Sequence, residues 1–304
     1  MKIATTTSDF GRYCKTDIER IRELHRAGFR YIDLNMYSFS PNCEYMRDDW
    51  KDAVKALKNE ADSLGMTFVQ AHSQGGNPLK DDEDHVKFLL DATVRSIEIC
   101  AELGIKNTVV HPGQARGIEK DEWFERNREF YKKLFSAMEA TGVNVLTENS
   151  TAVNMKDKYF ANTGRDMRDF LEFVGHPMLH ACWDTGHGNC EGSQYDELVT
   201  LGDQLYAIHY NDNHGKGDQH LIPYWGTLNH DEIINALIDI DYKGYFTLEC
   251  DSGLVPSNYW LYGRGEFAKD NRLAEPQLFM RRKLEELLYE TANYILSSYG
   301  LLEK

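Results

Sequence analysis

Six successive β-like stretches of this sequence each end in a histidine or an acidic residue. These side-chain types bind divalent metal ions and transfer protons. One of the stretches, "CWDTGHGN", carries Asp184 and His187 three residues apart. A single acid or histidine after a strand is usually a helix cap or a hydrogen-bonded residue, so the repetition in six stretches is the more specific signal. The residues are His72, His111, Glu148, Asp184 with His187, His209 and Glu249.

The later members of this set suit a metal ion best. Glu148, Asp184, His209 and Glu249 supply three carboxylates and one imidazole. Burying several carboxylates together is costly unless a cation neutralises them. Hard oxygen ligands with one nitrogen fit Mn²⁺, Mg²⁺, Co²⁺ or Zn²⁺, and the sequence does not choose between these ions. We therefore predict one divalent metal ion at this set.

The surrounding pattern predicts how these residues meet. β-like stretches alternate with helix-like stretches along the chain, and the β-like ones cover residues 1–6, 29–36, 66–72, 106–113, 143–149, 178–186, 205–213 and 244–251. Such alternation indicates a parallel sheet, and eight units in about 250 residues is the size of a closed (β/α)₈ barrel. No GxGxxG follows the first stretch to favour an open doubly wound sheet. We predict one domain, residues 1–304, with a barrel to about 255 and a helical tail over about 256–304.

In such a barrel the carboxyl ends of the strands form the active-site mouth. The predicted metal ion chelates adjacent oxygens of a hydroxy-carbonyl substrate and acidifies the C–H bond between them. Glu148 and Glu249, from different strands, are then placed to remove and return a proton through an enediolate. The sequence thus predicts a metal-dependent isomerase or epimerase with two catalytic glutamates.

Composition restricts the partners. The net charge is −15, and no basic patch offsets it, so we expect neither a nucleic-acid nor a membrane partner. The 41% of hydrophobic residues is enough for a core without any segment that could span a bilayer. Six scattered cysteines form no CxxC motif, and the first residues contain no apolar signal core. We therefore expect a cytoplasmic protein.

Several motifs together resemble a known family. "LTEN", "CWDTGHGN", "AIHYNDN", "GDQHL" and "TLECD" are similar to the xylose-isomerase-like TIM-barrel superfamily, in its sugar phosphate isomerase/epimerase and AP endonuclease family 2 branch, over roughly residues 1–250. The resemblance to ketose 3-epimerases and inosose isomerases implies that Glu148, Asp184, His209 and Glu249 bind the metal. It also implies that Glu148 and Glu249 form the acid–base pair, that His187 bonds a substrate hydroxyl, and that the chain forms dimers or tetramers.

The loop after the seventh strand departs from that family pattern. Epimerases of this kind usually have an arginine there, whereas "NDNHGKGDQHL" offers Lys216, Asp218 and His220. The sugar specificity therefore stays open. We expect an unphosphorylated sugar or cyclitol, because no glycine-rich phosphate cradle follows the last two strands.

The same residues permit a phosphodiesterase. Resemblance to endonuclease IV-like enzymes would give a trinuclear zinc site, and the net charge of −15 opposes such a DNA enzyme. The first zinc would lie at His72, His111 and bridging Glu148, the second at Glu148, Asp184, His209 and Glu249, and the third at His187, Asp218 and His220.

Two further kinds of protein share parts of this pattern. A metal-dependent lyase or C-glycoside-cleaving enzyme would use the same proton abstraction, and a sugar-binding module would not need three converging carboxylates. Around a single metal ion, the remaining polar residues bind the substrate or support the ligands. Trp225 could stack on a sugar face, or it could simply pack against the C-terminal helices. The predicted substrate-binding residues are His187, His72, His111, Asp218, His220 and Trp225.

Overall fold

The computed structural model describes residues 1–155, 159–255 and 275–303. Eight parallel strands form one sheet in the order β7-β6-β5-β4-β3-β2-β1-β8. Strands β1 to β7 thus pair in the order of the sequence, and β8 pairs with β1, as a singly wound barrel requires. The strands are β1 (Ile3–Thr6), β2 (Tyr31–Asn35), β3 (Thr67–His72), β4 (Asn107–Val109), β5 (Asn144–Glu148), β6 (Leu179–Asp184), β7 (Leu205–His209) and β8 (Phe246–Leu248).

The ring closes between β7 and β8. Tyr210, directly after β7, bridges Leu248 in parallel orientation. The Tyr210 N–H donates to the Thr247 carbonyl at 2.7 Å, and the Glu249 N–H donates to the Tyr210 carbonyl at 3.2 Å. The predicted (β/α)₈ barrel is therefore confirmed, and its closing contact holds Glu249 beside the end of β7.

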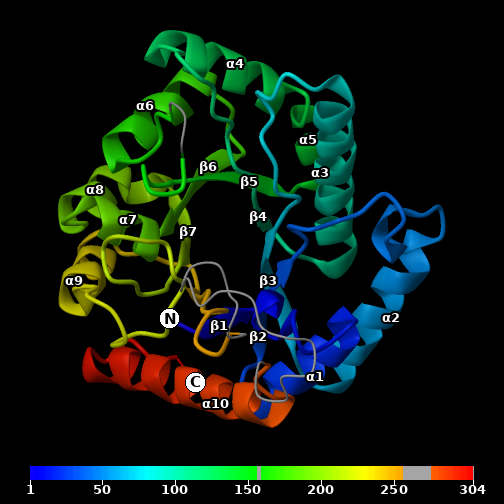
Figure 1. The fold of residues 1–304 in the computed structure, drawn as a ribbon, viewed down its shortest axis with the longest axis vertical. Coiled ribbons are helices and arrows are strands. Elements are labelled where there is room, and N and C mark those ends of the chain that lie inside the picture. Colours follow the sequence, from blue (N-terminus) through cyan, green and yellow to red (C-terminus); the bar gives the residue numbers. More distant parts are fainter. Residues whose placement is uncertain (156–158, 256–274, 304) are drawn as a thin grey trace.

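Helices surround the strands (Figure 1). α4 and α5 are separate helices, because the backbone N–H groups of Lys133 and Leu134 bond back three residues instead of four. The helices are α1 (Asp17–Ala27), α2 (Trp50–Ser63), α3 (Glu83–Leu103), α4 (Lys120–Lys132), α5 (Phe135–Thr141), α6 (Gly164–Val174), α7 (Thr185–Glu191), α8 (Tyr195–Leu201), α9 (His230–Asp239) and α10 (Leu278–Ser298). Short 3₁₀ helices span Thr7–Phe10, Glu44–Met46 and Gly202–Gln204.

The C-terminal helix α10 covers one side of the barrel beside α1 (Figure 1). Its Tyr289 ring meets the Phe29 ring edge-on, with centroids 5.1 Å apart. Its Arg281 is fully buried and donates to the carbonyl of Cys250, the residue after Glu249. The predicted helical tail is thus present as α10, while residues 256–274 of that tail lie outside the described residues. No described helix is long and apolar enough to cross a membrane.

A small apolar layer fills the barrel beneath the ends of β4 to β7. It consists of Val109, Leu146, Cys182 and Ala207, all fully buried. Each lies two positions before a predicted site residue, namely His111, Glu148, Asp184 or His209. Because side chains on a strand alternate between its faces, both sets point into the barrel. The apolar layer therefore forms the floor on which the polar site rests.

Candidate metal centre

Four of the predicted ligands converge at the mouth of the barrel. One ligand atom from each of Glu148, Asp184, His209 and Glu249 lies within 4.8 Å of the others. The His209 Nδ1 atom is 2.6 Å from Glu148 Oε1 and 3.3 Å from Glu249 Oε2. The Glu148, Asp184 and His209 side chains are buried, and that of Glu249 keeps 14% exposure toward the cavity. These four residues are called the ligand group below.

Asp184 owes its orientation to the turn from β6 into α7. Its Oδ1 accepts from the His187 backbone N–H at 2.7 Å, so Asp184 is the N-cap of α7. Its Oδ2 accepts from the Asn211 side chain at 2.7 Å. Gly186 permits this approach, because a Cβ there would lie 1.9 Å from the Asn211 side-chain oxygen. The spacing of Asp184 and His187 is thus a helix cap that also aims both side chains at the mouth.

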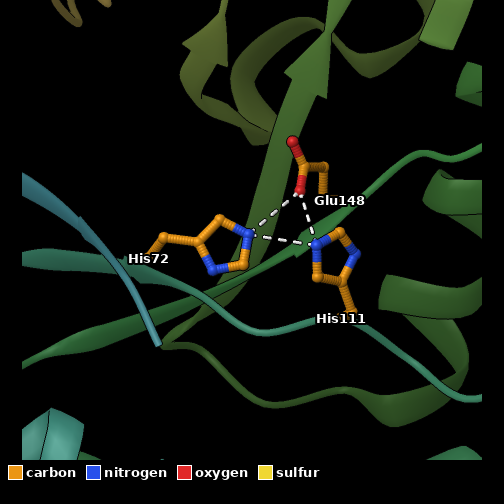
Figure 2. Close-up of side chains that lie close together, drawn as sticks. All are labelled: His72, His111 and Glu148. Carbon is orange, nitrogen blue, oxygen red and sulfur yellow. Dashed lines mark hydrogen bonds and ion pairs between the residues drawn. The ribbon is translucent and has the colours of Figure 1, made fainter. Parts of the chain in front are cut away.

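His72 and His111 form a second group around the other oxygen of Glu148 (Figure 2). Their Nε2 atoms are 3.0 Å apart. Glu148 Oε2 lies 3.1 Å from His111 Nε2 and 3.7 Å from His72 Nε2. The exposed Tyr37 ring stands edge-on to both imidazoles. Glu148 therefore joins the ligand group to the histidine pair.

A third group lies beside Asp184 and consists of His187, Asp218 and His220. His187 Nε2 and His220 Nε2 each approach the Asp218 carboxylate to 3.2 Å. The Asn154 amide donates to Asp218 Oδ2 at 2.7 Å. His220 has a positive φ of 48°, which a side chain rarely adopts without a compensating contact. The loop after β7 is thus fixed against the loop after β5.

Protonation differs between the two glutamates. Burial opposes the charge of Glu148, but His209 and His111 hold its pKa well below the usual range. For Glu249, burial raises the pKa, and the nearby carboxylates add to this effect. Burial also lowers the pKa of His111 to about 3, which keeps that ring neutral. In the metal-free protein Glu249 therefore takes up a proton more readily than Glu148.

The ligand group has the chemistry of a divalent-ion site. The ion pairs of Glu148, Asp184 and Glu249 in the described residues all have histidines as partners. Once these acids and His209 have lost their protons, the three buried carboxylates carry negative charge that a divalent cation would neutralise. Three oxygens and one imidazole nitrogen are compatible with Mn²⁺, Mg²⁺, Co²⁺ or Zn²⁺. The residues present therefore fit a metal ion.

A cavity of about 700 Å³ opens above this site. Its described lining contains amides and hydroxyls from several loops, among them Asn35, Asn77 and Gln114, and no lysine or arginine. Of the predicted substrate-binding residues, His72, His111, His187, Asp218 and His220 line the cavity. Trp225 lies instead in a neighbouring hollow, which shares Ser252 with the cavity, and its role stays a prediction. Lys216 is exposed and does not line the cavity.

Sequence reasoning missed the polar residues behind the ligands. Asp33 in β2 and Gln70 in β3 are buried and face His209 from below. Asn149 bonds both the N–H and the carbonyl of Asp184. The available signal was an acid within an otherwise buried strand, "YIDLN", which is a rare and costly position.

Comparison with known proteins places the chain in a family. The family model described as xylose isomerase-like TIM barrel matches residues 21–275. The chain belongs to this family. The resemblance inferred from the motifs is therefore confirmed.

The curated relatives that match this chain share only a low sequence identity with it. Fructoselysine 3-epimerase of Shigella flexneri is 23% identical over 241 residues, covering 75% of this chain and 83% of the relative. D-psicose 3-epimerase of Enterocloster bolteae is 32% identical over 99 residues, covering 32% of this chain and 31% of the relative. An uncharacterized protein of Methanocaldococcus jannaschii is 25% identical over 179 residues, 57% of this chain, and the match spans 60% of that relative.

Solved structures of the family share the fold over nearly the whole chain. D-psicose 3-epimerase from Clostridium cellulolyticum, crystallised with D-tagatose, has a TM-score of 0.74 at 19% identity, covering 97% of this chain and 99% of that one. The IOLI protein with a bound zinc atom has a TM-score of 0.74 at 15% identity, covering 99% and 100%. At these identities the likeness concerns the barrel alone.

Proposed function

We propose that this protein is a divalent-metal-dependent epimerase or isomerase of an unphosphorylated ketose, inosose or related sugar. The observation that carries the proposal is the convergence of Glu148 and Glu249, from β5 and β8, on the same imidazole nitrogen of His209. Two carboxylates then flank one reacting position, as proton transfer at a carbon beside a carbonyl requires. Similarity to fructoselysine and D-psicose 3-epimerases supports the same class of reaction.

The reaction divides between the two glutamates. A divalent ion held by the ligand group would supply Lewis acidity, which would polarise the substrate carbonyl and acidify the adjacent C–H bond. One glutamate removes that proton, leaving an enediolate on the substrate. The other glutamate returns a proton to the opposite face, which inverts the carbon. His187 and the His72–His111 pair bind hydroxyl groups of the sugar and hold it between the two carboxylates.

The cavity lining supports a neutral polyhydroxy substrate. Amide and hydroxyl side chains such as Asn35 and Gln114 can donate and accept hydrogen bonds with sugar hydroxyls. The described lining contains no lysine or arginine that would pair with a phosphate. A lyase acting on a glycoside would begin with the same proton abstraction and is separated from the epimerase only by its product.

A second candidate function rests on a specific observation. The histidine pair with Glu148, and Asp184 with His187 and His220, each place possible ligand atoms within 4.8 Å of one another. For a trinuclear zinc phosphodiesterase, the first of these groups is the predicted first zinc set, and the second contains His187 and His220 of the predicted third set with Asp184 in place of Asp218. The net charge of −15 weighs against a DNA substrate, because DNA-binding proteins neutralise several phosphates with basic side chains.

A proton-exchange experiment tests the proposal. The protein is incubated in D₂O with D-psicose, D-tagatose and D-fructose, with added Mn²⁺ or with chelator, and deuterium at the carbon beside the carbonyl is followed by NMR. We expect exchange and epimer formation only with the metal. Hydrolysis of abasic-site DNA, without deuterium exchange into any of the sugars, would contradict the proposal.

A further inference from the structure

The two ring nitrogens of His209 face different surroundings. Nδ1 points to the mouth of the barrel, toward Glu148 and Glu249. Nε2 points down into the barrel, where it lies 3.3 Å from Asp33 Oδ2 and 2.9 Å from Gln70 Nε2. Nδ1 is therefore the atom that His209 can offer to a metal ion in the ligand group.

A neutral imidazole binds a metal through the nitrogen that carries no proton, so the proton must then be on Nε2. That N–H needs an acceptor, and the Asp33 carboxylate is the acceptor that faces it. Gln70 cannot accept the hydrogen bond from Nε2. Its amide nitrogen donates to Asp33 Oδ2 at 2.7 Å, and its amide oxygen accepts from Thr247, which together fix the amide with its nitrogen toward His209.

Asp33 and Gln70 thus favour opposite tautomers of His209. Asp33 accepts a proton from Nε2 and leaves Nδ1 with a free lone pair. Gln70 can donate to Nε2 only if that atom is unprotonated, which puts the proton on Nδ1, where it points at Glu148. In this second tautomer Nδ1 carries the proton and has no free lone pair with which to bind the metal ion.

We propose that Asp33 is a positioning residue that holds His209 in the tautomer able to bind the metal ion. The proposal rests on the metal-dependent function proposed above. Carboxylate–histidine–metal arrangements of this kind fix the ring orientation and increase the basicity of the ligand.

The burial of Asp33 supports a role beyond packing. Asp33 is fully buried, and its Oδ1 has no hydrogen-bond partner among the described residues. A buried carboxyl group that forms hydrogen bonds through only one oxygen is costly inside a barrel, where an apolar side chain would fill the space more favourably. This cost is explained if the other oxygen, Oδ2, accepts a hydrogen bond from His209 Nε2.

Metal affinity provides the test. Mn²⁺ binding is measured by calorimetry for the wild type, Asp33→Leu, Asp33→Asn and Gln70→Leu. We expect Asp33→Leu to weaken binding by about 10- to 100-fold. Asp33→Asn, which keeps an acceptor oxygen, should lose less. Gln70→Leu is the matched control, because it removes a buried polar neighbour of the same ring, and it should bind as tightly as the wild type or more tightly.

The outcomes separate this proposal from the proposed function. Wild-type protein that binds no Mn²⁺ would overturn both. Wild-type binding that is unchanged in Asp33→Leu, or weakened equally in Gln70→Leu, would overturn only the role of Asp33.

A spectroscopic measurement decides the matter if Asp33→Leu does not fold. ¹⁵N NMR of the metal-free wild type, at a pH high enough for His209 to be neutral, should show a proton on Nε2 and none on Nδ1, and the His209→Gln variant identifies the signal. An unprotonated Nε2 in the wild type would overturn the proposal.

Discussion

Glu148 and His209 form the closest polar contact of the ligand group, with 2.6 Å between Glu148 Oε1 and His209 Nδ1. The other oxygen of Glu148 lies 3.1 Å from His111. Glu148 is therefore the one residue that belongs to both the ligand group and the histidine pair. The first prediction therefore concerns the loss of the negative charge of Glu148 or of Glu249.

Glu148→Gln and Glu249→Gln should each reduce turnover by about 10²- to 10⁴-fold, because each removes one of the two proton-transferring carboxylates. The measurement is kcat with the identified sugar at saturating Mn²⁺, together with circular dichroism to show an intact fold. Glu122→Gln, in an exposed part of α4, is the control and should be fully active. Full activity in either active-site variant would contradict the two-carboxylate mechanism.

His111→Gln should leave the metal content unchanged, because His111 is proposed to bind substrate and not the ion. Loss of one hydrogen-bonding group costs about 1 kcal/mol, which raises KM roughly fivefold. Asp184→Asn is the comparison, and it should lose metal. If His111→Gln loses zinc as Asp184→Asn does, that result would favour the trinuclear zinc site and contradict the single-ion site.

Metal affinity should fall as the pH falls. Burial raises the pKa of Asp184 and of Glu249 in the metal-free protein. For His209 burial lowers the pKa, but the nearby acidic groups, Cys182 and Glu249 first, raise it well above the usual value. Groups with raised pKa values hold protons that the ion must displace, so each proton released weakens binding about tenfold per pH unit of acidification. An Mn²⁺ dissociation constant that stays constant from about pH 8 to about pH 6 would contradict this coupling.

Arg281→Met should destabilise the fold by about 3 to 5 kcal/mol, because it leaves two buried acids without their cation. Arg281 lies 3.2 Å from Asp9 and 2.7 Å from Glu285, and all three side chains are fully buried. Urea unfolding measures the loss. Lys283→Met on the same helix removes an exposed ion pair with Glu286 and should cost less than about 1 kcal/mol. Equal losses in the two variants would show that the buried cluster does not anchor α10.

The ligand group was predictable because its members lie where strands end. Glu148, Asp184 and His209 are the last residues of their strands, and Glu249 follows β8 directly. Parallel strands in a barrel bring such positions to one edge, so alternation of elements and residue type were enough. The same reasoning located His72 at the end of β3 and His111 two residues after β4.

Asp33 escaped sequence reasoning for a physical reason. It lies in the middle of β2, where no strand-end pattern applies, and its partner His209 is 176 residues away. Only closure of the ring brings β2 and β7 to face each other across the interior. Trp225 shows the converse, because this aromatic residue of the long segment between β7 and α9 lies in a neighbouring hollow and not in the cavity above the site.

The metal content of the protein tests the central claim most directly. Elemental analysis of protein purified without chelators requires no knowledge of the substrate. We predict about one divalent ion per chain, lost on Asp184→Asn substitution and retained on His111→Gln substitution. About three zinc ions per chain, or no divalent metal even after incubation with Mn²⁺, Co²⁺ or Zn²⁺, would contradict the single-ion site.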